Sequence, residues 1–69
     1  MNVYRLQIGN GDATEEFFYV RKADAVVQAI ATMAKFPGVT WFQYGDYPQW
    51  DSTTKGTFYH VGVEEIEVL

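Results

Sequence analysis

The residues that could do chemistry in this 69-residue chain are His60, the acidic residues, five tyrosines, and Ser52 with several threonines. A hydrolytic site needs a nucleophile, a base and an orienting group in one pocket, and these residues follow no spacing that such a site uses. His60 is the single histidine and the chain has no cysteine, so the usual ligands of a zinc site are missing. We therefore expect a protein that is not an enzyme, with no metal and no cofactor. His60 is interpreted as a strand residue in a packed or half-exposed position.

Two short patterns resemble functional sites without meeting their requirements. Glu15 and Glu16 are neighbours in a predicted strand, where adjacent side chains point to opposite faces, so they cannot act on one substrate together. Residues 9–12 contain the glycines of a phosphate-binding loop, but the Lys and Ser/Thr of that loop and the helix that follows it are missing. The Asn10-Gly11 pair instead predicts a type I′ hairpin turn.

Segment 45–55, GDYPQWDSTTK, is the longest one without periodicity, and its composition predicts a loop or a wide hairpin connection. Tyr47 and Trp50 lie on either side of Pro48, between Asp46 and Asp51. Aromatic residues beside carboxylates on a loop are typical of protein-recognition sites. The alternative is that Tyr47 and Trp50 fold back and cap an open end of the core. With aromatic residues of the preceding strand, the predicted partner-binding residues are Trp41, Tyr44, Asp46, Tyr47, Trp50 and Asp51.

The clearest element that could position these residues is a helix over residues 23–35. Val26, Val27, Ile30, Met33 and Ala34 follow the 3.6-residue period that gathers side chains on one side, and polar residues gather on the other. The Phe-Pro-Gly triplet at 36–38 predicts that the helix ends at Lys35 or Phe36. Because a lone helix of this length is marginal in water, its apolar side must pack on the β-rich sequence around it.

A hairpin is predicted before the helix. Residues 2–8 alternate between apolar and polar side chains, which indicates a half-buried strand. Residues 14–20 are apolar on both sides in their second half, so alternation does not fix which side faces the helix. Either Phe17 with Tyr19 or Phe18 with Val20 packs against it.

Further strands are predicted after the helix. Residues 39–44 carry aromatic side chains on both sides, so either Trp41 or the Phe42 and Tyr44 pair lies on the face away from the helix. Residues 57–63 form the last long strand. Its alternation breaks at residues 64–65, which predicts a β-bulge or a tight turn before a short fifth strand.

The predicted order is β-β-α-β-β, which makes residues 1–69 a single α+β domain. We expect one helix packed on one face of a four- to five-stranded, mainly antiparallel sheet. The element order, Trp41-x-x-Tyr44 and Lys55-Gly56-Thr57-Phe58 resemble the β-grasp topology of the immunoglobulin-binding domains of protein G. That resemblance implies first and last strands that lie parallel at the centre of the sheet. No binding residue is assigned from it. A meander with sequential strand order is the alternative.

The charge of the chain bears on its partners. Nine acidic and five basic residues give a formal net charge of −4. Direct binding of nucleic acid needs clustered Lys and Arg to neutralise phosphates, so it is not expected here. The sequence has no run of about 18 apolar residues and no secretory signal at its start, so we expect no membrane association and a cytoplasmic location.

One helix covers only one face of a sheet, and aromatic residues left exposed on a small domain are typical of a binding surface. We therefore expect a small acidic protein-binding module, an inhibitor or adaptor of the kind that phages and mobile elements use against host complexes, including nucleic-acid-handling defence complexes. Against a basic cleft, its acidic groups could stand in for phosphates. Those groups are Asp46, Asp51, Glu64, Glu65 and Glu67. The alternative is a structural or self-assembling homodimer subunit, joined face to face or by edge strands.

Overall fold

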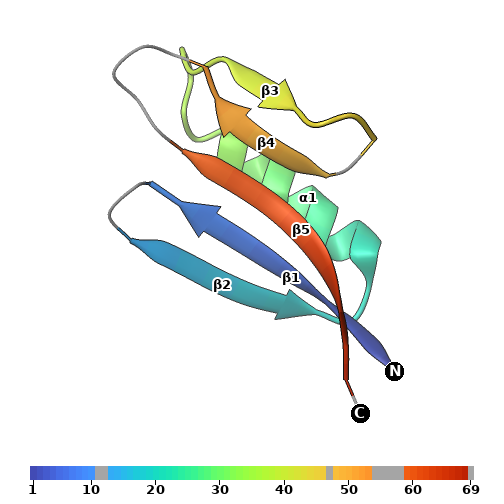
Figure 1. Cartoon of the computed structure of the whole chain (residues 1–69). Helices are drawn as coiled ribbons and strands as arrows, with labels where there is room; N and C mark the ends of the chain where they lie inside the picture. Colours follow the sequence, from blue (N-terminus) through green and yellow to red (C-terminus); the bar gives the residue numbers. More distant parts are fainter. Residues whose placement is uncertain (11–12, 47, 54–58, 69) are drawn as a thin grey trace.

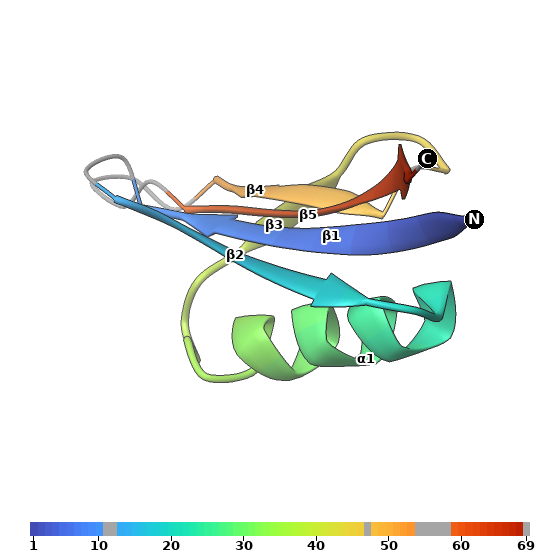
Figure 2. The ribbon, with the colours of Figure 1, turned by 90° about the horizontal axis from the view of Figure 1, so that it is seen from below.

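The computed structural model describes residues 1–10, 13–46, 48–53 and 59–68. The elements in chain order are β1 (Asn2–Gly9), β2 (Thr14–Tyr19), α1 (Lys22–Met33), β3 (Trp41–Gln43), β4 (Gln49–Ser52) and β5 (His60–Glu67). The strands form one five-stranded antiparallel sheet in the order β2-β1-β5-β4-β3 (Figure 1). Figure 2 shows α1 lying along one side of this sheet. The predicted α+β fold class is therefore confirmed, with five strands.

The centre of the sheet differs from the β-grasp arrangement. β1 and β5 lie side by side as expected, but they pair antiparallel, with Leu6 opposite Val63. The reason is the number of chain reversals after α1. Three strands, β3, β4 and β5, follow the helix as a meander, so β5 runs in the direction opposite to the one that two strands would give it.

The additional strand is β4, which lies inside the segment that was predicted to be a loop. It is only four residues long and pairs with β3 on one side and β5 on the other. Gly45 and Pro48 are the turn signals that hid it, and they belong to the short connection between β3 and β4. The prediction of a loop or a wide hairpin connection over 45–55 is therefore wrong for residues 49–52, which form β4, and residues 47, 54 and 55 lie outside the described part.

The last strand is continuous where a bulge or tight turn was predicted. Its residues pair one to one with β1, from His60 opposite Gly9 to Glu67 opposite Asn2. The apolar pattern changes phase because Ile66 lies opposite Val3 on the sheet face away from α1, and no residue is inserted. Residues 57 and 58, the predicted start of this strand, lie outside the described residues.

The first hairpin closes later than predicted. A type I′ turn centred on Asn10 and Gly11 would place Gly9 opposite residue 12, whereas Gly9 pairs with Thr14. Asn10 donates its backbone N–H to the carbonyl of Ala13, and the Asn10 side-chain oxygen accepts a hydrogen bond from the Ala13 N–H. Residues 11 and 12 lie outside the described part of the chain.

The register also decides which strand residues face the helix. Because directly opposite residues share a face, Phe17 and Tyr19 lie with Leu6 and Tyr4 on the helix side. Trp41 and Trp50 pack against the core from the same side. Phe18, Phe42 and Tyr44 are therefore left on the other face of the sheet, which settles the two alternatives that alternation left open.

The core is small, and the helix faces it with alanines. Its buried residues are Leu6, Ala25, Ala29, Val61 and Val63. α1 packs on β1, β5 and β2, and the small side chains of Ala25 and Ala29 let the helix approach the sheet closely. Val27 and Ile30, predicted to be buried, are 60% and 54% exposed.

The helix is therefore rotated relative to its predicted buried side, although Val26 and Met33 still pack against the core. It ends at Met33, before the predicted end at Lys35 or Phe36, and Gly38 provides a positive φ of 90° in the link to β3.

Candidate functional site

The sheet face opposite α1, called the open face below, is the candidate site. No described element covers it (Figure 2). Its aromatic residues lie near the two edges of the sheet: Phe18 on β2, and Phe42 and Tyr44 on and after β3. They are 60%, 54% and 43% exposed, respectively. Phe42 and Tyr44 contact each other edge to face, with ring centroids 5.4 Å apart.

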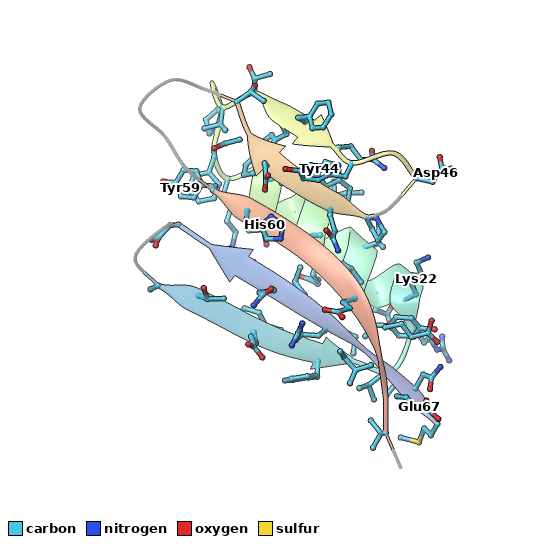
Figure 3. The ribbon with its side chains drawn as sticks, viewed as in Figure 1. Lys22, Tyr44, Asp46, Tyr59, His60 and Glu67 are labelled. Carbon is cyan, nitrogen blue, oxygen red and sulfur yellow. The ribbon has the colours of Figure 1, made fainter. Side chains whose placement is uncertain are left out.

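A hydrogen-bonded chain of three side chains crosses the open face. Tyr44 follows β3, Asp51 lies on β4 and His60 on β5, and Figure 3 shows Tyr44 and His60 on the near side of the sheet. The Tyr44 hydroxyl donates to one carboxylate oxygen of Asp51, Oδ2. The other oxygen, Oδ1, lies 2.6 Å from Nδ1 of His60. Asp51 therefore holds residues from both neighbouring strands.

These contacts change the acid–base properties of Asp51 and Tyr44. Partial burial raises the pKa of Asp51, but the hydrogen bonds from Tyr44 and His60, together with the charge of His60, bring it below its ordinary value of 3.8. The hydrogen bond to Asp51, with burial and the carboxylate charge, raises the pKa of Tyr44 above 10.0. The Tyr44 hydroxyl therefore stays protonated and the Asp51 carboxylate stays ionised over a wide pH range, and these are the forms that hydrogen bond to each other.

The position of the His60 ring depends on a glycine. A Cβ on Gly62 would lie 3.1 Å from Nε2 of His60 and 3.3 Å from Cγ of Gln49. Since contacts this short are tighter than ordinary van der Waals contact, the ring occupies the space that the missing side chain leaves. Gly62 thus allows the His60 ring to lie beside it on the open face.

Further along the open face lies an ion pair. Arg5 and Glu64 are directly opposite each other on β1 and β5, and Nη2 of Arg5 is 2.5 Å from Oε2 of Glu64. Nε of Arg5 is buried without a hydrogen-bond partner among the described residues. Glu16 of β2 lies directly opposite Gln7 of β1, on the same face. The described open face therefore carries carboxylates at three positions, one of them balanced by a guanidinium.

The Asp51–His60 pair resembles two members of a catalytic triad, so the nucleophile decides the chemistry. Ser52 is opposite Trp41 and therefore lies on the helix side of the sheet, away from His60. Its hydroxyl accepts a hydrogen bond from the backbone N–H of Tyr59. Ser52 does not join His60 and Asp51, and the arrangement of the described residues serves recognition better than nucleophilic attack.

The predicted partner-binding residues fall into separate groups. Tyr44 and Asp51 are brought together on the open face. Asp46 is exposed in the turn between β3 and β4, at the far end of that hairpin from His60 (Figure 3). Tyr47 lies outside the described residues.

Both tryptophans lie on the helix side. Trp50 is half-buried and packs against the core, as the capping alternative proposed. Trp41 also packs there and contacts two further rings, Phe36 and Tyr59, with centroids 6.5 and 6.2 Å away. Neither ring therefore contributes to the open face.

Among the open-face residues absent from the predicted set are His60, Phe42 and Phe18. The signal for Phe42 and Phe18 was present, because strand alternation placed each of them in one of two alternatives. The contact between His60 and Asp51 had no signal, since it requires β4, which the sequence presents as a loop.

Within the described residues, no three His, Asp or Glu side chains are grouped to hold a metal ion. No helix there is long and apolar enough to cross a membrane. Comparison of the chain with protein-family models, curated proteins and solved structures returned no match. The open face is therefore the feature that bears on function.

Proposed function

We propose that this protein is a small acidic protein-binding module that works without catalysis, as an inhibitor or adaptor, and that the open face meets its partner. One observation carries this proposal: the helix covers one side of the sheet only, while Phe18, Phe42 and Tyr44 are exposed on the other. Aromatic side chains are enriched at protein interfaces because they bury a large area at a low entropy cost.

The charges of the open face favour a basic partner. Asp51 and Glu64 lie between the aromatic edges and Glu16 lies on β2 with Phe18, while Arg5 pairs with Glu64 and His60 with Asp51. Lys or Arg side chains of a partner would gain from these carboxylates and from the rings of Tyr44 and Phe42. Such charge complementarity also raises the association rate, which makes binding sensitive to salt.

The class of partner follows from this charge. Basic protein surfaces are common in complexes that handle nucleic acids, so a host complex of that kind is the proposed target, and a phage or mobile element is the proposed source of the chain. Phosphate mimicry is not part of the proposal. Glu65 and Glu67 lie opposite Tyr4 and Asn2, on the helix side, so they form no strip with Asp51 and Glu64.

The test is affinity capture from an extract of the native host, with identification of the bound proteins by mass spectrometry. Phe42→Ala removes an exposed ring of the open face, and Val27→Ala removes an exposed side chain of α1 as the matched control. Circular dichroism establishes that both variants fold.

We expect the parent and Val27→Ala to retain the same partner, Phe42→Ala to lose it, and rising salt to elute it. Equal retention by both variants would show that the open face is not the binding surface.

A homodimer is the second candidate function, and the exposed edge of β2 favours it.

A further inference from the structure

The outer edge of β2 is open for pairing with another strand. β2 is the first strand of the sheet order, so among the described strands only β1 pairs with it. Because Asn10 N–H bonds to the Ala13 carbonyl, the hydrogen-bonded pairs of this antiparallel ladder continue at Ile8–Glu15, Leu6–Phe17 and Tyr4–Tyr19. The backbone N–H and C=O groups of Thr14, Glu16 and Phe18 therefore point away from β1, outward from the edge of the sheet.

This edge also carries exposed apolar surface. Phe17, Phe18 and Val20 are all exposed, and the residues of β2 are exposed from Thr14 to Phe18. Edge strands of monomeric proteins are usually short, twisted or covered, because their free main-chain groups attract other strands. The opposite edge, β3, has three residues, whereas β2 has six. β2 is therefore the stronger edge for association.

We propose that β2 pairs antiparallel with β2 of a second copy of this chain, about a two-fold axis at Phe18. In this register Phe18 lies opposite Phe18 of the second copy, and Phe17 opposite Tyr19. Glu16 lies opposite Val20, and Glu15 opposite Arg21. β2 ends at Tyr19, and Arg21, the residue before α1, has a backbone in the extended region, with φ −113° and ψ 133°.

Charge favours this register over those with the axis at Glu16 or at Phe17. An axis at Glu16 places the Glu16 side chains of the two copies opposite each other, which is destabilising. An axis at Phe17 leaves Glu15 opposite Tyr19 and Glu16 opposite Phe18, with no partner for either carboxylate. The axis at Phe18 gives each Glu15 an Arg21 as its opposite-charge neighbour. It also brings the two exposed Phe18 rings into contact, so the edge is complementary to itself.

Dimerisation through β2 uses Phe18, one of the three aromatic residues of the open face, and leaves the other two exposed. A two-fold axis perpendicular to the sheet keeps both helices on one side and both open faces on the other. Dimerisation through β2 therefore leaves Phe42, Tyr44 and Asp51 free to contact a foreign partner, and it places two copies of that surface on one continuous sheet.

A single-cysteine cross-link tests the pairing, and the absence of natural cysteines makes it clean. Phe18→Cys places two sulfurs across the axis, where opposite Cα atoms of a hydrogen-bonded pair lie about 5.5 Å apart, within disulfide range. Val27→Cys, on the exposed side of α1, is the control. Under mild oxidation we expect Phe18→Cys to become mostly covalent dimer and Val27→Cys to remain mostly monomer. Equal cross-linking of both variants would overturn the proposal.

A charge exchange tests the register without removing Phe18. In Glu15→Arg, two attractive pairs become two repulsive ones, so sedimentation equilibrium should give a dimer dissociation constant at least about tenfold higher. In the double variant Glu15→Arg/Arg21→Glu the pairs are restored with reversed signs, and the dissociation constant should return to within about threefold of the parent. A monomeric parent at millimolar concentration, or a double variant as weak as Glu15→Arg, would overturn the register.

Discussion

Asp51 of β4 lies directly opposite His60 of β5, with its Oδ1 2.6 Å from Nδ1 of the imidazole, while its second oxygen accepts a hydrogen bond from Tyr44. One carboxylate thus connects three neighbouring segments of the sheet on the open face. The relationship also gives the site a pH dependence whose sign can be stated.

The Tyr44–Asp51 hydrogen bond should stabilise the fold in a defined pH window. The lowered pKa of Asp51 gives a contribution that is present above 3.8 and is lost as the pH falls through the folded-state value. The raised pKa of Tyr44 gives one that is present below 10.0 and is lost as the pH rises through its folded-state value. In urea unfolding, the stability difference between the parent and Tyr44→Phe should be flat between these limits and smaller outside them. A difference that does not change with pH would contradict the contact.

Asp51→Asn should lower the pKa of Tyr44 toward 10.0, because the hydrogen bond to the carboxylate and the negative charge that raise it are removed. Phenolate absorbance measures this titration. Subtracting the curve of the matched Tyr44→Phe variant isolates Tyr44 from the other four of the five tyrosines. Identical Tyr44 titrations in the parent and in Asp51→Asn would show that the two side chains do not interact in solution.

Gly62→Ala should displace the His60 ring. The new Cβ would lie 3.1 Å from Nε2, so the imidazole must move and its hydrogen bond to Asp51 is weakened, at a cost of about 1 kcal/mol. In a His60→Ala background the same substitution should cost less, and a double-mutant cycle should give a coupling of roughly 0.5–1 kcal/mol. Additive effects would mean that the ring is not held over Gly62.

The orientation of α1 can be tested by one substitution at two positions. Ala29→Leu adds a large side chain where the helix meets the sheet and should destabilise the fold by about 1–3 kcal/mol. Ala31→Leu makes the same change at an exposed position and should stay within about 0.5 kcal/mol of the parent. Urea denaturation measures both. A helix packed through Val27 and Ile30 would tolerate Ala29→Leu.

Trp50→Ala should act on stability before it acts on binding. The ring packs against the core from the helix side, so its loss should cost roughly 2–4 kcal/mol, and melting should occur at a lower temperature. A captured partner that disappears with this variant would therefore say little about recognition. If Trp50→Ala unfolds at the parent temperature, the placement of Trp50 in the core is wrong.

The fold could be predicted from the sequence where one periodicity dominated. The alternation of β1 and the helical period of α1 gave both elements and the two-layer class. The buried side of α1 was wrong because Ala25 and Ala29 carry little hydrophobic weight in a sequence pattern, although their small size is what brings the helix close to the sheet.

The candidate site was harder to predict for a related reason. β4 has four residues between turn signals, and without it the chain reverses once too few times, so β5 was given the wrong direction. The Asp51–His60 contact depends on that strand. Tyr44 and Asp51 were selected for their residue types alone, and the pairing of β3 with β4 supplies the reason that they meet.

The most direct test of the open face is site-specific photo-cross-linking in the host extract. A photoreactive phenylalanine analogue replaces Phe42 in one variant and Val27 in the other, both of which are more than half exposed. We expect a covalent adduct with the captured partner from position 42 and none from position 27. An adduct from position 27 alone, or capture of the partner with no adduct from position 42, would contradict the open face as the binding surface.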